Sequence, residues 1–317
     1  MIKRLVVIDG HAILHRAYHA LPPLTAPDGT VVNAVYGFAS MLLRVIHDLK
    51  PEYLIVAFDH AKPTFRKKLF KEYQAQRPEM EKTLISQIDL VKRMVDLMGI
   101  SVYGLDGYEA DDVIGTISTA AGNQKLGDCQ LETIIVTGDR DILQLVNNKV
   151  KVYLPVKGIS ESKMYGISEV EEKFGIKPSQ IADFKALVGD TADNYPGVAG
   201  IGPKTAVDLL HKFKTVEEVY RNLNSIEGKV KEKLIQDKEN AFMSKKLATI
   251  VCDVPIEIDL ARSKLASLEK PGVINFFEEM EFRSMIPRLS SGKEGALLMS
   301  QKAAKKKQDN SKQTSLF

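Results

Sequence analysis

Short aliphatic runs alternate with longer amphipathic stretches over the first half of the chain. The runs at 4–9, 52–59 and 132–141 are rich in β-branched residues and end in Asp, as buried strands of a layered fold do. Between them, 32–49 and 83–99 carry apolar residues at helical spacing, and the second stretch ends in Gly, a usual helix stop. Alternation of strands and helices predicts right-handed crossovers and an α/β fold with a mainly parallel sheet.

The pattern changes twice further along the chain. Strand signals thin out near residue 165 and helical patterns follow, so we predict an α/β core over 1–165 and a helical region over 166–288. Residues 289–317 are polar, lysine-rich and free of aromatic residues until the last position, which is typical of a flexible basic tail.

Composition excludes several classes of protein. Of the 317 residues, 44% are hydrophobic, and 44 Lys or Arg against 41 Asp or Glu give a formal net charge of only +3. No apolar run approaches the ~20 residues of a membrane helix. The two cysteines form neither a metal-ligand pattern nor a disulfide framework. We expect a monomeric cytoplasmic protein that makes no membrane contact.

Acidic residues gather where the predicted strands end and where a following helix begins. Each one alone could be a turn former or a helix cap. The carboxyl ends of parallel strands meet at one edge of a sheet, so the acids are expected to converge there. There are nine of them: Asp9, Asp59, Glu109, Asp111, Asp112, Asp139, Asp141, Asp190 and Asp193.

Such a convergence predicts bound cations. Like charges repel, so in the absence of metal at least one of Glu109, Asp111 and Asp112 should have a raised pKa. Oxygen ligands without His or Cys suit Mg²⁺ or Mn²⁺. The number of acids suggests two ions, and paired ions ~4 Å apart are a standard device for phosphodiester cleavage.

Two further stretches indicate nucleic acid. Residues 60–82 hold seven Lys or Arg against three Glu, interleaved with Phe65, Phe70 and Tyr73. They could form a solvated amphipathic helix, or a basic element that a single-stranded 5′ end passes through. The stretch 197–210, "GVAGIGPKTAVDLL", has the shape of a helix–hairpin–helix, with Gly200 and Gly202 in the hairpin. It could also be a turn between packed helices, but its free N–H groups suit a phosphate.

Five motifs, in order along the chain, carry a family resemblance: "VIDGHAILHRAYHA", "AFDHAKPTFRKKLFKEY", "DGYEADDVIGT", "VTGDRDILQLV" and "LVGDTADNYPGVAGIGPKTA". Together they resemble the 5′-nuclease (flap endonuclease) family over residues 3–288. They are most similar to the N-terminal 5′→3′ exonuclease domains of bacterial DNA polymerase I. The resemblance implies a PIN-like nuclease core, a helical arch at 60–82, and a helical region that grips duplex DNA through a helix–hairpin–helix at 194–211.

The resemblance also implies roles for particular residues. One metal cluster would be Asp9, Asp59, Glu109, Asp111 and Asp112, and a second Asp139, Asp141, Asp190 and Asp193. Catalytic side chains would be Lys185, Arg77 and Tyr73. DNA would contact Arg16, Tyr18, Arg66, Lys67, Lys68, Lys71, Gly200, Gly202, Lys204 and Thr205, with K⁺ at the hairpin. In one departure, Gln74 stands where the family usually has lysine.

The implied substrates are DNA with a 5′ flap, a nick or a free 5′ end, and RNA–DNA primer junctions, during replication and repair. We expect a stand-alone, nucleoid-associated nuclease. The final "QTSLF" could be a frayed end, but it is similar to bacterial sliding-clamp-binding peptides, with Gln313, Leu316 and Phe317 as anchors.

Two alternatives to a nuclease follow from the same residues. A non-cleaving module that binds branched DNA and recruits partners is kept open by Gln74, whereas the complete set of nine acids favours cleavage. An aspartyl-phosphate phosphatase would also begin with "VIDG", but it needs a second Asp where this chain has His11. The residues favour the nuclease.

Overall fold

The computed structural model describes residues 2–123, 129–157 and 161–290. The predicted clamp-binding residues Gln313, Leu316 and Phe317 lie outside the described residues.

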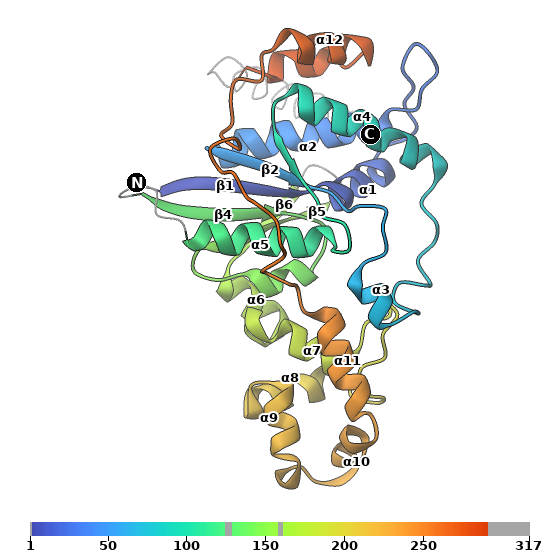
Figure 1. The fold of residues 1–317 in the computed structure, drawn as a ribbon, viewed down its shortest axis with the longest axis vertical. Coiled ribbons are helices and arrows are strands. Elements are labelled where there is room, and N and C mark those ends of the chain that lie inside the picture. The colour runs from blue at the N-terminus through green and yellow to red at the C-terminus, as the bar shows by residue number, and fades with distance from the viewer. Residues whose placement is uncertain (1, 124–128, 158–160, 291–317) are drawn as a thin grey trace, which may run out of the picture.

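A six-stranded sheet forms the centre of the molecule (Figure 1). Its order is β3-β2-β1-β4-β5-β6, and every described neighbour pair is parallel except β5 with β6. The predicted α/β fold with a mainly parallel sheet is therefore confirmed. The strands are β1 (Ile2–Asp9), β2 (Tyr53–Ala57), β3 (Ser101–Tyr103), β4 (Gln130–Val136), β5 (Val150–Lys157) and β6 (Glu161–Tyr165).

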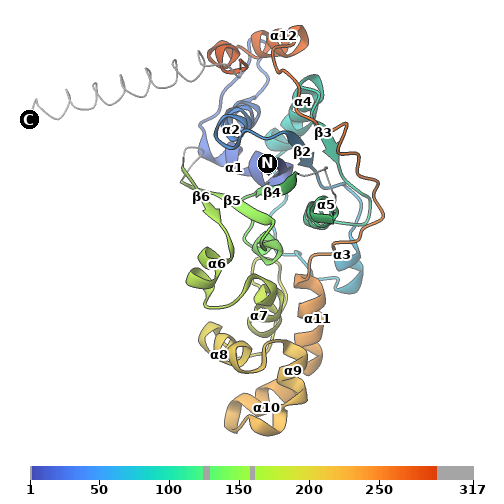
Figure 2. The ribbon, with the colours of Figure 1, turned by 90° about the vertical axis from the view of Figure 1, so that its left-hand side faces the viewer.

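Helices cover both faces of the sheet, which explains why its central strands are continuous apolar runs. Alternate residues of β1 enter two different cores: Leu5 and Val7 face α5, whereas Val6 and Ile8 face α1, α2 and α4. Figures 1 and 2 show α2 and α4 on one side of the sheet and α5 on the other. These helices are α1 (Gly10–Ala20), α2 (Asn33–Leu49), α4 (Lys82–Leu97) and α5 (Ala110–Asn123).

A second, helical region extends from the sheet after β6 (Figure 1). It consists of α6 (Ile167–Phe174), η2 (Pro178–Gln180), α7 (Ile181–Val188), α8 (Pro203–Phe213), α9 (Val216–Arg221), η3 (Leu223–Ser225), α10 (Gly228–Gln236) and α11 (Lys238–Ala248).

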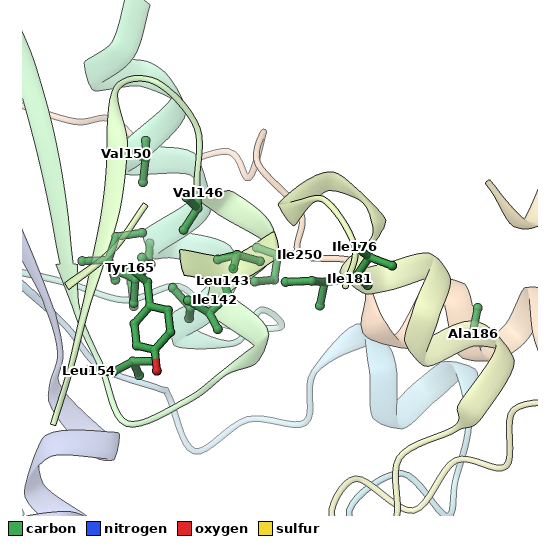
Figure 3. Close-up of a cluster of buried hydrophobic side chains, with 14 of the residues drawn as sticks. Ile142, Leu143, Val146, Val150, Leu154, Tyr165, Ile176, Ile181, Ala186 and Ile250 are labelled. Atoms are coloured by element: carbon green, nitrogen blue, oxygen red, sulfur yellow. The ribbon is translucent and has the colours of Figure 1, made fainter. Parts of the chain in front are cut away.

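One continuous apolar cluster joins the sheet to this helical region. Ile142 and Leu143 belong to η1 (Asp141–Leu145), which follows β4, and they are fully buried beside Ile181 of α7 and Ile250 (Figure 3). The shared core fixes α7 against the edge of the sheet where the acidic strand ends lie. This packing holds the acidic segments at 139–141 and 190–193 in fixed positions relative to each other.

The last described helices return to the α/β core, which differs from the predicted helical region at 166–288. The helix α12 (Pro271–Glu279) and η4 (Arg283–Arg288) bury Phe276, Phe277 and Phe282 in the same cluster as α2 and α4. Figure 1 shows α12 at the opposite end of the molecule from α10. The reason is that α2 and α4 have an apolar face which α12 covers.

The segment 60–82 also differs from the predicted helical arch. Between residues 60 and 81 the described helix is α3 (Phe65–Leu69), and turns and irregular chain follow it up to α4. Proline lacks the N–H that a helix interior needs, so Pro63 and Pro78 limit helix formation on either side. The left-handed backbone of Gln74 (φ 55°) breaks it again.

Within the described ranges, no helix is both long and apolar enough to cross a membrane.

Candidate active site

The ends of β1 and β2 place two carboxylates at one edge of the sheet. Asp9 ends β1 and caps α1, accepting hydrogen bonds from the Ala12 backbone N–H (3.0 Å) and Thr137 Oγ1 (2.7 Å). Asp59 follows β2 and accepts from the Ala110 N–H (2.8 Å) at the start of α5. Both carboxylates are therefore held by the backbone of a helix that begins beside them.

The start of α5 adds two more carboxylates to this edge. Glu109 accepts weak contacts from Thr64 Oγ1 (3.3 Å) and Tyr73 OH (3.2 Å). Among the described residues, none donates a hydrogen bond to the Asp111 carboxylate, which lines the cleft beside Asp9 and Asp139. We refer to Asp9, Asp59, Glu109, Asp111 and Asp139 as the strand-end group.

Burial and mutual repulsion raise the pKa values of three members of the strand-end group. Burial is the largest cause in each, and neighbouring carboxylates add to it. The pKa of Asp9 rises to about 6 and that of Glu109 to about 7, while that of Asp111 rises well above its usual range, with Asp139 as the strongest charge acting on it. The expected raised pKa within 109–112 is therefore found. A divalent cation fits this donor set, because it removes the repulsion that the protein's own residues leave.

Asp59 is the exception in this group. Burial raises its pKa, but hydrogen bonding and attraction from His11 and the Ala110 N–H outweigh that effect, so the net pKa lies below its usual value. The His11 Nδ1 atom is 3.1 Å from Asp59 Oδ2. Asp59 therefore ionises at a lower pH than Asp9, Glu109 and Asp111.

A second set of acids forms where η1 and the end of α7 meet. Carboxylate oxygens of Asp141, Asp190 and Asp193, which we call the helix-end group, all lie within 4.8 Å of one another. The Lys185 ammonium ion-pairs with both Asp141 and Asp190. Asp193 Oδ1 accepts from Arg77 Nη2 (2.6 Å). Each of these acids therefore has a basic side chain against it.

Lys185 separates the pKa values of its two partners. Burial raises the pKa of Asp141 to about 6 although the Lys185 ammonium opposes it. For Asp190, burial also raises the pKa, but the hydrogen bond and charge of Lys185 outweigh it, and the net pKa is lowered.

Asp139, a member of the strand-end group, also contacts the helix-end group, so it does not lie wholly in the second predicted cluster. Its Oδ1 accepts the Asp141 N–H (2.8 Å), and its charge raises the pKa values of Asp9, Asp111 and Asp141 alike. The two predicted metal clusters are therefore connected through Asp139.

Asp112 and Arg66 do not have the roles predicted for them. Asp112 is fully buried and bound bidentately by Arg66, with Nη1–Oδ2 and Nη2–Oδ1 distances of 2.7 and 2.8 Å. Its two oxygens also accept the N–H groups of Val251 (2.9 Å) and Glu109 (3.1 Å). With four donors already bound, the carboxylate has no free position for a metal.

Arg66 is equally enclosed, at 2% exposure, and cannot reach a phosphate in this conformation. It also donates to the carbonyls of Leu247 (2.8 Å) and Thr249 (2.9 Å). The pair therefore ties the base of the segment at 60–82 to α5 and to the chain leaving α11. The sequence alone did not distinguish Asp112 from its neighbour Asp111.

A cleft of about 1280 Å³ opens above the strand-end group. The segment 60–82 forms one wall and α1 another, and basic side chains line both. The cleft is also bounded by Asp141, Asp193, Tyr73, Gln74 and by Arg16, Lys62, Lys67 and Arg77.

Other predicted DNA contacts lie elsewhere. Lys68 and Lys71 are exposed but do not line the cleft. The Tyr18 hydroxyl bonds to Glu81 Oε2 (2.5 Å) and Thr83 Oγ1 (2.7 Å), so it joins α1 to the start of α4 instead of facing a nucleotide. Lys185 stands behind Asp141, outside the cleft lining.

Tyr73, Gln74 and Arg77 converge on one acid. Tyr73 OH (3.2 Å) and Gln74 Nε2 (3.2 Å) both contact the Asp193 carboxylate, as Arg77 does. Burial and the charges of Glu109 and Asp193 raise the pKa of Tyr73, so its hydroxyl stays protonated and donates. The position occupied by Gln74 is therefore part of the cleft.

The predicted hairpin is present before α8. Gly200 has φ 75°, and Gly202 precedes Pro203 at the first position of the helix, with Lys204 and Thr205 in its first turn. Two residues of α10 and its end hold the hairpin backbone: Lys233 Nζ donates to Gly200 O (2.8 Å) and Asp237 Oδ2 accepts the Ala199 N–H (2.8 Å).

Sequence reasoning missed two supporting residues of the strand-end group, Thr137 and His11. Thr137 Oγ1 both donates to Asp9 and accepts from the Asp139 N–H (2.9 Å), which links two strand ends. Its place directly before "GD" at the end of β4 was the available signal.

These features define a class of protein. A family model described as the 5′-3′ exonuclease N-terminal resolvase-like domain matches residues 4–175, and one described as the 5′-3′ exonuclease C-terminal SAM fold matches residues 176–271. The chain belongs to the 5′-3′ exonuclease family and is a nuclease of that class.

Relatives of the chain include DNA polymerase I from several bacteria. The chain is 41% identical over 288 residues to DNA polymerase I of Bacillus subtilis (strain 168), which covers 90% of this chain and 32% of that protein. It is 40% identical over 288 residues to DNA polymerase I of Caldicellulosiruptor bescii, covering 90% and 33%. The chain thus spans about a third of the length of these relatives.

Solved structures share the fold at low sequence identity. The bacteriophage T5 D15 flap endonuclease, in a complex with DNA and metal ions, is 22% identical with a TM-score of 0.64, covering 88% of this chain and 100% of that one. The catalytic core of Rad2 with a DNA substrate is 14% identical with a TM-score of 0.59, covering 90% and 92%. At these identities the likeness shows the fold.

Proposed function

We propose that this protein hydrolyses phosphodiester bonds near the 5′ end of DNA, at flaps, nicks or free 5′ ends, with bound divalent cations. The observation that carries the proposal is the strand-end group: five carboxylates converge in a basic-walled cleft, and three have raised pKa values. A cation is the simplest means of stabilising them together.

The strand-end group would hold one Mg²⁺ or Mn²⁺, and the helix-end group, with Asp139 between them, a second. When bound, such ions lower the pKa of a water molecule and stabilise charge on phosphate oxygens. Asp59 offers an ionised oxygen for this purpose, because His11 and the Ala110 N–H keep its pKa low.

Other side chains would position the DNA. Arg77 lies at the cleft surface, 52% exposed at its side chain, and can exchange its contact with Asp193 for a phosphate. Tyr73, held between Glu109 and Asp193, keeps these two acids at a fixed separation. Lys185 neutralises Asp141 and Asp190 from behind.

The hairpin at 197–202 would bind the duplex away from the cleft. The first-turn N–H groups of α8 and the side chains of Lys204 and Thr205 suit a phosphate oxygen and read no bases. We include K⁺ at the hairpin as part of the proposal, at carbonyls other than that of Gly200, which accepts from Lys233.

A second candidate is a module that binds branched DNA without cutting it. Gln74 favours it, because a neutral amide stands beside Asp193 where the family usually has an ammonium. Arg77 argues for cleavage, since its guanidinium contacts the same oxygen of Asp193 and supplies a cation at that place.

Cleavage of a 5′-labelled flap duplex by the purified chain tests the proposal. Parallel reactions would contain Mg²⁺, Mn²⁺ or a chelator, and a matched RNA-primer substrate would measure preference. We expect product of defined length at the junction with either metal and none with chelator. Tight flap binding without product under both metals would instead support the non-cleaving module. In that case Gln74→Lys should restore cleavage.

We also propose that Gln313, Leu316 and Phe317 bind the bacterial sliding clamp. The support is their sequence alone, in which two large apolar residues end a polar tail. A binding titration would compare the full chain with a chain ending at Lys312. Weaker clamp binding by the shorter chain is expected, and equal affinity would end the proposal.

A further inference from the structure

Three histidines occupy one face of α1, spaced four residues apart: His11, His15 and His19. Residues four apart on a helix lie one above the other, about 6 Å along its axis. All three line the cleft. The row therefore leads from the strand-end group, where His11 contacts Asp59, towards the outer part of the same cleft.

His15 and His19 are hydrogen-bonded to each other through their ring nitrogens, so one ring donates a proton that a bound metal ion would replace. Their Nε2 atoms are 3.2 Å apart, and their ring centroids are 4.4 Å apart with the rings tilted by 62°. Both residues are exposed. Two imidazole nitrogens at about 2.0–2.1 Å from a tetrahedral ion stand roughly 3.3 Å from each other. The pair is thus already spaced to chelate such an ion.

The surroundings of the pair favour the neutral form of His15. Burial, His19 and Arg77 lower the pKa of His15, whereas the Glu81 carboxylate acts in the opposite direction. A neutral ring keeps its lone pair available. Glu81 is itself held in place by the Tyr18 hydroxyl, so its negative charge stays beside the pair.

We propose that His15 and His19 form a binding site for a borderline-soft divalent ion such as Zn²⁺, separate from the carboxylates that suit Mg²⁺ or Mn²⁺. The two classes of ion are sorted by ligand type, since imidazole suits zinc and carboxylate suits magnesium. Two Nε2 atoms fill half of a tetrahedral shell. The other two positions open into the cleft, where water or a phosphate oxygen can occupy them.

His11 is not part of this site. Its Nδ1 is engaged by Asp59, at 3.0 Å from the backbone N and 3.1 Å from Oδ2. The site is therefore a two-histidine chelate in the outer part of the cleft. An ion there would obstruct a nucleic acid strand in the cleft without displacing the ions at the carboxylates; this consequence, unlike the binding itself, rests on the proposed function.

The test is a ZnCl₂ titration of the full chain in excess Mg²⁺, followed by imidazole ¹⁵N NMR. The variants are His15→Gln and His19→Gln. The matched control is His47→Gln, which removes an exposed histidine of α2 that contacts Asp48. Thermal unfolding of each variant without zinc checks that the fold is retained.

We expect the His15 and His19 resonances to shift together and to saturate at one equivalent of Zn²⁺. Either single variant should lose this binding event, and the control should keep it. Unchanged zinc binding in both variants, or shifts only around the carboxylates, would overturn the proposal. Zinc inhibition of Mg²⁺-supported cleavage, relieved in the same two variants, would extend it to function. Because the NMR readout needs no cleavage, failure of this site and failure of the proposed nuclease activity can be told apart.

Discussion

The two carboxylate groups of the cleft differ in how the protein compensates their charge. In the helix-end group, Lys185 pairs with Asp141 and Asp190, and Arg77 pairs with Asp193. In the strand-end group, within the described part of the chain, Arg66 reaches only Glu109 (3.3 Å) and no Lys or Arg forms an ion pair with the other members. The helix-end group is largely neutralised by neighbouring basic side chains, and the strand-end group is not.

The difference indicates where a cation contributes most. An ion at the strand-end group would relieve repulsion among buried carboxylates, whereas at the helix-end group it would compete with Lys185 and Arg77. We therefore expect tighter divalent binding at the strand-end group. Substitutions in the strand-end group, at the adjacent Asp112 and in the helix-end group can separate these contributions.

The largest expected effect is that of Asp111→Asn on cleavage. The amide keeps the shape of the side chain but removes the charge that lies free in the cleft. We expect kcat for flap cleavage to fall by about 10³-fold, the upper range for loss of one pre-organised electrostatic group. DNA affinity should change little. Single-turnover kinetics and a binding isotherm measure both, with Asp48→Asn on α2 as the control. Cleavage at the normal rate would remove Asp111 from the metal site.

For the adjacent residue, Asp112, the main expected effect is on stability. Asp112→Ala leaves the buried Arg66 guanidinium without its carboxylate, which should lower the free energy of unfolding by about 3–5 kcal/mol. Chemical denaturation measures this loss. Arg93→Ala, which breaks an exposed pair with Glu279, should cost less than about 1 kcal/mol. If Asp112→Ala were as mild as the control, the structural role assigned to Asp112 would be wrong.

A smaller effect is expected from Lys185→Gln. This change removes a basic partner of the helix-end group, which then resembles the strand-end group. Loss of the ammonium between Asp141 and Asp190 should lower the free energy of unfolding by about 1–3 kcal/mol without metal. Added Mg²⁺ should then stabilise the variant more than it stabilises the wild type. The matched control is Lys245→Gln, which removes a lysine bridging Asp183 and Glu217 in the helical region. That variant should lose stability without any change in its response to Mg²⁺. An equal response in both variants would contradict the comparison.

Hydrophobic periodicity was sufficient to predict three of the six strands, β1, β2 and β4, and the two long helices α2 and α4. The apolar runs at 4–9 and 52–59 became β1 and β2 because a strand buried on both faces has no polar alternation to obscure it. The return of α12 to the core could not be predicted, since its apolar face is compatible with any apolar partner.

Convergence of the acids was also predictable, but their separate environments were not. Asp111 and Asp112 are adjacent on α5 and point in different directions, one into the cleft and one towards Arg66. Only the fold brings Arg66 and Val251 to Asp112, from 46 and 139 residues away. Likewise, Gln74 contacts Asp193 through a left-handed backbone conformation that no sequence pattern predicts.

Thermal unfolding of the wild type and Asp111→Asn, each with chelator and with Mg²⁺, measures whether a cation relieves the repulsion among the strand-end carboxylates. The folded-state pKa of Asp111 lies above its unfolded value, so its stabilising contribution is full in acid and is lost as the pH rises through the folded pKa. At neutral pH with chelator, Asp111→Asn should therefore unfold at a higher temperature than the wild type. Mg²⁺ should raise the Tm of the wild type and raise that of the variant much less. A variant that is less stable in chelator and equally stabilised by Mg²⁺ would show that Asp111 neither repels its neighbours nor binds the cation.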